Sequence, residues 1–289
     1  MKPARFRYLR PETLEEALAM LAEWGDDAAV LAGGQSLVPM LNLRMAQPAV
    51  LIDVNRIAGL DRIEIIGERL HVGARARHAE VLRSATVARA APLLALALGN
   101  VAHEAVRNRG TFGGSLALAD PAAEIPAVTV CLDGAILARS STGERRIPAA
   151  SFFEGVYTTA LRPEELLVGV DFAPLGPDFR FCFREVSRRH GDFALAAIAF
   201  AGRIEAGRVG ECRVVFAGVE ESPRRLAAVE AALAGAAVSD EQAWRAAGDG
   251  LGAVLDPIEG AEYPAAYRLL LARNLLLETR RQLEEEAAR

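Results

Sequence analysis

Two glycine pairs, each beside small hydroxyl residues, constrain this chain more than any other feature. The first lies in "LAGGQSLVPMLNLR", residues 31–44, and the second in "RNRGTFGGSLALADPAAEIPAV", residues 107–128. Glycine has no Cβ, so it accepts positive φ and lets backbone N–H groups approach a ligand, which suits a diphosphate that needs several donors. Each pair alone is more simply a tight turn. Their recurrence favours one shared ligand.

The composition is that of a globular protein. The chain has 289 residues, of which 52% are hydrophobic and 25% charged, enough to bury one large core or two modest ones. A formal charge of -5 with scattered basic residues argues against nucleic-acid binding. Apolar runs are interrupted well before about 18 residues, so we expect no membrane span.

The cysteines indicate no metal centre. Cys131, Cys182 and Cys212 lie far apart, with no CxxC pair and no histidine at finger-like spacing, and His103 likewise lacks a second ligand. We therefore expect no zinc or iron-sulfur site in this chain. An odd cysteine count and a start without signal-peptide pattern predict a cytoplasmic protein.

The N-terminal half alternates short strands and helices. "RFRYL" predicts a strand, and the T-x-x-E capping box of Thr13 and Glu16 predicts a helix near 13–24. "AAVLAGG" and "AVLIDV" predict two further strands, which places the first glycine pair at a sheet edge. "RIEIIGERLHVGA" predicts two strands turning at Gly67, and the Ala- and Leu-rich stretch after it predicts two helices split near Pro92.

The C-terminal half predicts a second sheet with helices. "GAILARSSTGERRIPAASF" indicates a hairpin and "EELLVGVDFAP" a strand, before a boundary at "LGPDFR". Three antiparallel strands follow. "SPRRLAAVEAALAG" predicts a helix with Pro223 near its first turn and Gly235 past its end. A long helix is expected in the last 29 residues, from Ala261 onward. The fold class is α+β.

Common catalytic motifs are missing from the sequence. There is no G-x-G-x-x-G, no G-x-x-x-x-G-K-[ST], no G-x-S-x-G and no H-E-x-x-H. No nucleophile stands with an evident base, so we name no catalytic acid, base or nucleophile in the protein. Chemistry carried by a bound cofactor fits this pattern.

Four ordered stretches carry a family resemblance. "LAGGQSLVPMLNLRMAQPAVLIDVNRI" and "HEAVRNRGTFGGSLALADPAAEIPAV" resemble the FAD-binding medium subunit of the molybdenum hydroxylase family, which contains carbon monoxide dehydrogenase and xanthine dehydrogenase. "PEELLVGVDF" and "FREVSRRHGDFALAAIAF" follow in the same order, so the likeness covers nearly the whole chain. It implies an FAD-binding domain over 1–176, of two subdomains (1–56 and 57–176) that clamp the cofactor, and a smaller C-terminal sheet-and-helix domain over 177–289.

The resemblance also implies which residues bind FAD. The two glycine loops wrap the diphosphate with backbone amides, and Glu124 approaches the ribityl or ribose hydroxyls, where a carboxylate that accepts their protons is apt. Leu167 packs beside the flavin ring, Arg184 replaces a lysine near the flavin, and the 187–194 loop passes the exposed ring face. The implied residues are Ala32, Gly33, Gly34, Gln35, Ser36, Leu37, Thr111, Gly113, Gly114, Ser115, Ala117, Asp120, Glu124, Leu167, Arg184, Asp192 and Phe193.

Several positions have alternative readings. Phe193 stands where many family members have tyrosine, which removes a phenol donor. Leu118 and Ala76 also depart from the family pattern. His190 fits a solvated loop residue better than a proton relay. Ser36 fits a helix cap as well as a phosphate donor. Arg107 and Arg109 suit the anionic cofactor, a partner subunit or an ordinary surface equally.

The implied function is electron transfer. A molybdenum-containing large subunit oxidises the substrate, a small subunit with two [2Fe-2S] clusters relays single electrons, and this chain passes them through FAD to an external acceptor. The family assembles as a dimer of such heterotrimers. Carbon monoxide, aldehydes, purines and other N-heterocycles all fit as substrates, and quinone, oxygen or NAD as acceptor. A stand-alone FAD-dependent oxidase or reductase and a non-enzymatic nucleotide-binding scaffold are the alternatives.

Overall fold

The N-terminal unit is a small parallel sheet covered by a capped helix. In the computed structural model, which describes residues 2–287, three strands pair in the order β1-β3-β2. The predicted capping box is present, because Thr13 accepts from the N–H of Glu16 and Glu16 reaches back to the start of the helix. The elements are β1 (Arg7–Leu9), α1 (Leu14–Trp24), η1 (Gly25–Asp27), β2 (Ala28–Leu31), α2 (Leu37–Asn42), β3 (Val50–Asp53) and η2 (Val54–Arg56).

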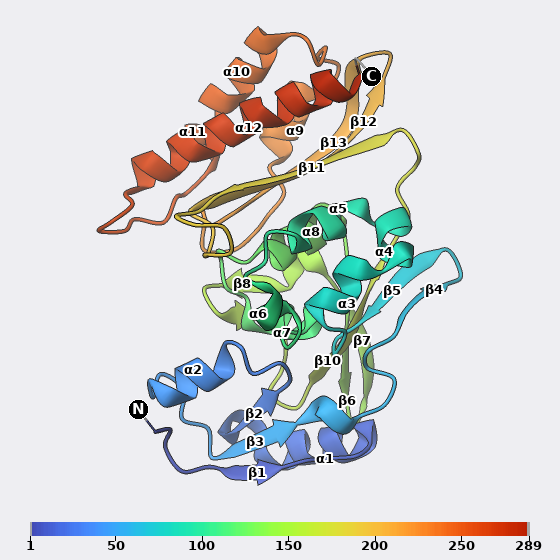
Figure 1. Cartoon of the computed structure of the whole chain (residues 1–289), viewed down its shortest axis with the longest axis vertical. Helices are drawn as coiled ribbons and strands as arrows, with labels where there is room; N and C mark the ends of the chain where they lie inside the picture. The colour runs from blue at the N-terminus through green and yellow to red at the C-terminus, as the bar shows by residue number, and fades with distance from the viewer. Residues whose placement is uncertain (1, 288–289) are drawn as a thin grey trace.

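The middle unit is a five-stranded antiparallel sheet packed against short helices (Figure 1). Its strand order is β4-β5-β10-β6-β7, and Gly67 turns β4 into β5 with φ of +62°, as the sequence predicts. Its elements are β4 (Ile63–Ile66), β5 (Arg69–Gly73), α3 (His78–Arg83), α4 (Ala85–Ala90), α5 (Pro92–Leu98), α6 (Glu104–Arg107), α7 (Phe112–Leu118), α8 (Glu124–Cys131), β6 (Ala135–Ser140), β7 (Gly143–Pro148), η3 (Ala149–Ser151), β8 (Phe153–Gly155), β9 (Thr158–Thr159) and β10 (Leu166–Phe172).

One helix prediction in this unit was incomplete. The stretch expected to form two helices split near Pro92 forms three, because the backbone leaves the helical region twice. Ser84 is extended, with ψ of 116°, and its hydroxyl accepts from the N–H of Val87, which starts a new helix. Ala91, with φ of -147°, makes the predicted break before Pro92.

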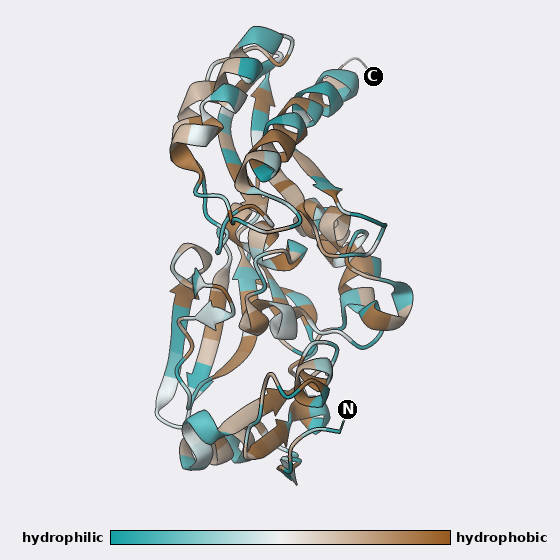
Figure 2. Ribbon diagram, turned by 90° about the vertical axis from the view of Figure 1, so that its left-hand side faces the viewer, coloured by the Kyte–Doolittle hydropathy of each residue, from teal (hydrophilic) through white to brown (hydrophobic). Residues whose placement is uncertain are grey.

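The C-terminal unit is a three-stranded antiparallel sheet with helices on its outer face. The strand order β11-β12-β13 is the predicted meander. Figure 2 shows hydrophobic and hydrophilic stretches alternating along the long helix that covers it. The elements are β11 (Phe179–Val186), β12 (Ala196–Glu205), β13 (Arg208–Ala217), α9 (Ala227–Leu233), α10 (Glu241–Asp249), α11 (Leu251–Val254) and α12 (Ala265–Ala287).

The start of α9 was predicted too early. Pro223 lies outside the helix, because the residues just before the helix still pair with the sheet. Arg225 bridges to Val215, and the N–H of Leu226 donates to the carbonyl of Val214 at 3.0 Å. The end is as predicted, since Gly235 follows the helix with φ of +80°. Helix α10, capped by Asp240, was not predicted.

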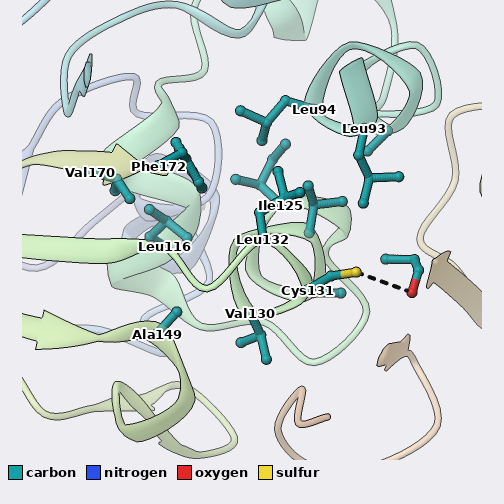
Figure 3. Packing of buried hydrophobic residues seen from close by; sticks show 14 of the residues in the cluster. Leu93, Leu94, Leu116, Ile125, Val130, Cys131, Leu132, Ala149, Val170 and Phe172 are labelled. Atoms are coloured by element: carbon teal, nitrogen blue, oxygen red, sulfur yellow. Dashed lines mark hydrogen bonds between the residues drawn. The ribbon is translucent and has the colours of Figure 1, made fainter. Parts of the chain in front are cut away.

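The core joins the middle and C-terminal units. Side chains alternate along β12: Ala197 and Ala199 face the core of the middle unit, whereas Ile198 and Phe200 face the outer helices. Figure 3 shows Leu93 and Leu94 directed at the helix that carries Cys131, whose thiol contacts the carbonyl of Ala199 across the boundary. Helices α5 and α8 therefore lie under the sheet, and α12 covers its opposite face.

Residues 2–287 contain no helix long and apolar enough to cross a bilayer. Within the same range, no three histidine, cysteine, aspartate or glutamate side chains gather in a way that could hold a metal ion. The domain boundary near residue 176, in the link between β10 and β11, stays a prediction.

Candidate functional site

A cavity of about 560 Å³ lies where all three units meet. The N-terminal unit contributes the loop between β2 and α2, and the middle unit contributes α7 and its preceding loop. The C-terminal unit contributes residues 191–193, which connect β11 to β12. The cavity is thus built from segments distant in sequence.

The first glycine loop offers unsatisfied donors. Within the described chain, the backbone N–H groups of residues 33–37 have no hydrogen-bond acceptor, whereas the next one, of Val38, donates to the carbonyl of Gly34. Gly34 adopts φ of +73°, which turns the chain into α2. Ser36 occupies the N-cap position of α2, as one of its two readings expects, but its hydroxyl makes no capping hydrogen bond to the helix. A run of free N–H groups at a cavity wall is a site for an anion.

The second glycine loop is held rigidly. Thr111 is the N-cap of α7, and its hydroxyl accepts from the N–H of Gly114 at 3.2 Å. The N–H of Gly113 donates to the carbonyl of Ala74 at 2.8 Å. A Cβ on Gly113 would lie 2.5 Å from that of Ala74, so glycine is required for this packing. The loop is therefore fixed to the end of β5.

The two loops touch one another. A Cβ placed on Gly33 would lie 2.5 Å from the carbonyl oxygen of Arg109 and 2.9 Å from the Cα of Gly110. No side chain fits between these backbones. The sequence pattern of two glycine pairs thus reflects one structure, in which the loops pack together at the cavity wall.

Arginines lie at and behind the two loops. Burial lowers the pKa of Arg77, and the like charges of Arg109 and Arg75 lower it further, whereas Glu80 and Asp53 oppose this shift. Arg75 lines the cavity and pairs with Asp61. Arg77 and Arg109 do not line the cavity, so they stand behind its wall, and Arg75 is the one of the three that faces it.

Glu124 begins α8 inside the cavity and is only 7% exposed. Burial raises its pKa from 4.5 to about 8, and the charges of Glu185 and Asp120 act in the same direction. The side chain is therefore mainly protonated at neutral pH. The sequence led us to expect a carboxylate, which can only accept hydrogen bonds. A protonated Glu124 can also donate a hydrogen bond to a hydroxyl group.

Sixteen of the seventeen predicted residues line this cavity, and Arg184 does not. Arg184 is exposed and lies on the same face of β11 as Cys182, whose thiol contacts Gln282 of α12. Because strand side chains alternate, the neighbouring Glu185 points to the opposite face. The cavity lining therefore gives no support to the predicted place of Arg184 near the ligand. His190 is exposed and does not line the cavity, which agrees with its reading as a solvated residue.

The side chains of Arg107 and Arg109 do not line the cavity either. Arg107 donates to the carbonyls of Val101 at 2.8 Å and Ala102 at 2.7 Å, and so holds the segment before the second glycine loop. Arg109 contributes its backbone carbonyl to the contact between the loops. Both residues therefore shape the loops from outside the cavity.

Two buried polar residues of the cavity, His78 and Glu165, were missed. His78 bonds through Nε2 to the carbonyl of Thr111 at 2.9 Å, and burial lowers its pKa to about 4, so it is neutral and donates. Glu165 accepts two bonds from Arg145, at 2.6 and 2.7 Å. Neither residue lies in a recognisable motif, and no local signal could have identified them. They are brought to the cavity by α3 and the start of β10.

Replacing Thr111 with valine tests the support of the second loop. The change keeps the shape but removes the N-cap oxygen, so we expect a loss of about 1 kcal/mol in the free energy of unfolding. Urea unfolding of the variant and the parent chain measures it. Thr158→Val, at an exposed hydroxyl bonded to the carbonyl of Val156, is the control and should change stability far less. Equal losses in the two variants would mean that the capping hydrogen bond of Thr111 adds no more stability than an exposed hydroxyl does.

The residues present fit FAD. Free N–H groups meet the need of a diphosphate for donors, and glycines leave the space that a Cβ would fill. Further along, Glu124 can exchange hydrogen bonds with hydroxyl groups, and Leu167 gives an apolar wall. Leu166 also lines the cavity beside Leu167.

Comparisons with known proteins agree with this site. Residues 4–174 match the family described as "FAD binding domain in molybdopterin dehydrogenase", and residues 181–283 match the "CO dehydrogenase flavoprotein C-terminal domain". The 6-hydroxypseudooxynicotine dehydrogenase complex subunit alpha of Paenarthrobacter nicotinovorans is 38% identical over 96% of this chain and 94% of its own length. The carbon monoxide dehydrogenase medium chain of Hydrogenophaga pseudoflava is 34% identical over 96% of both chains.

Among solved structures, quinoline 2-oxidoreductase from Pseudomonas putida 86 superposes with a TM-score of 0.93, at 35% identity and 99% coverage of both chains. The sequence matches and the superposition both extend through the N-terminal, middle and C-terminal units. The resemblance stated from four sequence stretches is confirmed, as is the α+β fold. This chain belongs to the molybdenum hydroxylase family, as an FAD-binding oxidoreductase subunit.

Proposed function

We propose that this chain accepts electrons from a [2Fe-2S] small subunit and passes them to an external acceptor, in an enzyme whose molybdenum-containing large subunit oxidises the substrate. The observation that carries the proposal is the cavity itself. The glycine loops at one part of the cavity suit a diphosphate. Phe193 lies at another part of the cavity and is 66% exposed, so a partner or acceptor can approach there. The names of the relatives, as a complex subunit and a medium chain, support the assembly.

The residues of the chain then act as holders and shields. The loops at residues 32–37 and 111–115 bind the diphosphate through backbone N–H groups, and the Ser36 hydroxyl is free to donate to it. Glu124, with Asp120 and Ala117 nearby, orients the sugar or ribityl hydroxyls. Leu167 excludes water from one side of the ring, and Asp192 and Phe193 border its accessible side. Bound FAD supplies the change between single-electron and paired-electron transfer.

We also propose that the assembly is a dimer of heterotrimers, located in the cytoplasm. All three cysteines are free and buried, which favours a reducing compartment. Substrate choice would belong to the large subunit.

Purification of the tagged full chain from its native host tests the assembly. We expect two other proteins to copurify, with molybdenum and iron in a constant ratio to FAD across the gel-filtration peak. Reduction of the bound flavin by substrate should require both partners. If the chain purifies without partners and turns over a small substrate by itself, the stand-alone oxidase or reductase is favoured. If it purifies without flavin, the scaffold is favoured.

A further inference from the structure

A chain of hydrogen bonds connects the two glycine loops outside the cavity. The amide nitrogen of Asn55 donates to the carbonyl of Ala32, in the first loop, at 2.8 Å. The guanidinium of Arg77 donates to the amide oxygen of Asn55 at 2.6 Å and, through its other terminal nitrogen, to the carbonyl of Arg109 in the second loop. Two side chains therefore link backbone atoms more than 70 residues apart in sequence.

The Asn55 amide has one orientation that satisfies all its partners. Asp53 accepts from the Asn55 side-chain nitrogen at 2.6 Å and from its backbone N–H at 2.9 Å. The nitrogen must face these acceptors, so the oxygen faces Arg77. Asp53 is only 6% exposed and also accepts from the hydroxyl of Tyr8. Burial would raise the pKa of Asp53, but these hydrogen bonds outweigh it and hold the pKa below its ordinary value.

The Arg109 carbonyl is confined from two directions. Arg77 binds it on one side, and the Cα of Gly33 packs on it so closely that no Cβ would fit. The backbone around Arg77 adds to this support: Arg77 forms a β-bridge with Thr111, and the N–H of His78 donates to the carbonyl of Gly110 at 3.0 Å. The separation of the loops is thus set from behind the cavity wall.

We propose that Asn55 and Arg77 are positioning residues, which fix the spacing of the two glycine loops and thereby set the affinity of the chain for FAD. Neither side chain lines the cavity, so each acts through the loop backbones. The inference rests on the proposed assignment of both loops to the FAD diphosphate. Backbone donors at fixed spacing bind a diphosphate without first having to be ordered, which is why preorganised loops bind more tightly.

Titration of the flavin-free full chain with FAD, followed by quenching of flavin fluorescence, tests this proposal. Asn55→Ala and Arg77→Met should each weaken binding by about tenfold, the effect of one or two lost hydrogen bonds. Because both side chains belong to one connection, the double variant should be little weaker than either single variant, instead of about a hundredfold weaker than the parent chain. Arg77→Lys keeps the charge and can reach one acceptor, so it should recover part of the affinity.

Matched controls separate positioning from general stability. Asn100→Ala removes the hydrogen bond from an asparagine side chain to the carbonyl of Leu96. Arg83→Met removes the hydrogen bond from an arginine of α3, the helix that follows Arg77, to Glu104. Both should leave FAD affinity unchanged. Circular dichroism and urea unfolding of every flavin-free variant show whether the fold persists, and Arg77→Lys provides the reading if the larger changes prevent folding.

Three results would overturn the proposal: unchanged affinity in the Asn55 and Arg77 variants, multiplicative losses in the double variant, or equal losses in the controls. In each of these cases the parent chain still binds FAD, so the assignment of the loops survives. A parent chain that fails to bind FAD would instead remove the loop assignment, and this inference with it.

Discussion

Replacing Gly33 with alanine is expected to lower the affinity of the chain for FAD by about a hundredfold or more, equivalent to about 2.7 kcal/mol. The added Cβ would lie 2.5 Å from the carbonyl oxygen of Arg109 and 2.9 Å from the Cα of Gly110. These are backbone atoms, so the clash cannot be relieved by rotating a side chain. The two loops must separate, and donors that face one diphosphate then lose their common geometry. Fluorescence titration of the flavin-free chain measures the effect.

Gly155→Ala is the matched control. No atom lies within 4 Å of the position that its Cβ would occupy, and its φ is not in the left-handed region. The same methyl group is therefore added without a clash, and FAD affinity should stay within about twofold of the parent chain. Unfolding of both flavin-free variants shows whether Gly33→Ala loses its fold. A folded Gly33→Ala chain that binds FAD normally would contradict the role given to the contact between the loops.

Local sequence signals predicted most of the fold. The capping box at Thr13, the turn at Gly67 and the three-stranded meander are all present, because each depends on residues close in sequence. The errors have local causes too. Ser84 caps a helix inside a stretch that composition alone describes as continuous, and residues near Pro223 are held extended by their pairing to β13.

The site was predictable only where the family resemblance reached it. The glycine loops, Asp120 and Glu124 line the cavity, whereas spacing alone suggested no more than paired turns, and their contact with FAD stays a prediction. Arg184 does not reach the cavity because strand alternation turns it toward α12 and turns Glu185 to the opposite face. Asn55 and His78 were missed because their importance lies in bonds to Ala32 and Thr111, which sequence distance conceals.

A buried acid in the cavity, Glu124, lies near a second acid outside the lining, Glu185. Both carboxyl oxygens of Glu185 are buried, and burial raises its pKa to about 7, which Ser187 opposes. Its charge helps to raise the pKa of Glu124. A negative charge is thus disfavoured at the start of α8, whereas the loops present free backbone N–H groups. The two parts of the cavity suit different parts of one ligand. The part around Glu124 suits hydroxyl groups, and the part around the glycine loops suits a diphosphate.

Replacing Glu124 with glutamine is expected to make the flavin-free chain more stable than its parent by an amount that grows with pH. In the folded chain the pKa of Glu124 is about 8, against an ordinary 4.5. Between these values the folded chain keeps a proton that the unfolded chain has released, so raising the pH favours unfolding. The parent should lose about 1 kcal/mol of stability per pH unit from this group, and nothing more above about pH 8. The variant has no proton to lose.

Urea unfolding of both chains from about pH 5 to about pH 8 checks this difference. Glu185 is present in both chains, so its own contribution, which ends near its pKa of about 7, largely cancels in the comparison. Glu221→Gln, at an exposed position, should run parallel to the parent. A Glu124→Gln chain that also stays parallel would mean that Glu124 is ionised in the folded chain.

Glutamine still donates hydrogen bonds to hydroxyl groups and accepts them, so near pH 6 the FAD affinity of Glu124→Gln should stay within about threefold of the parent. A larger loss would mean that the acid proton itself is needed for binding.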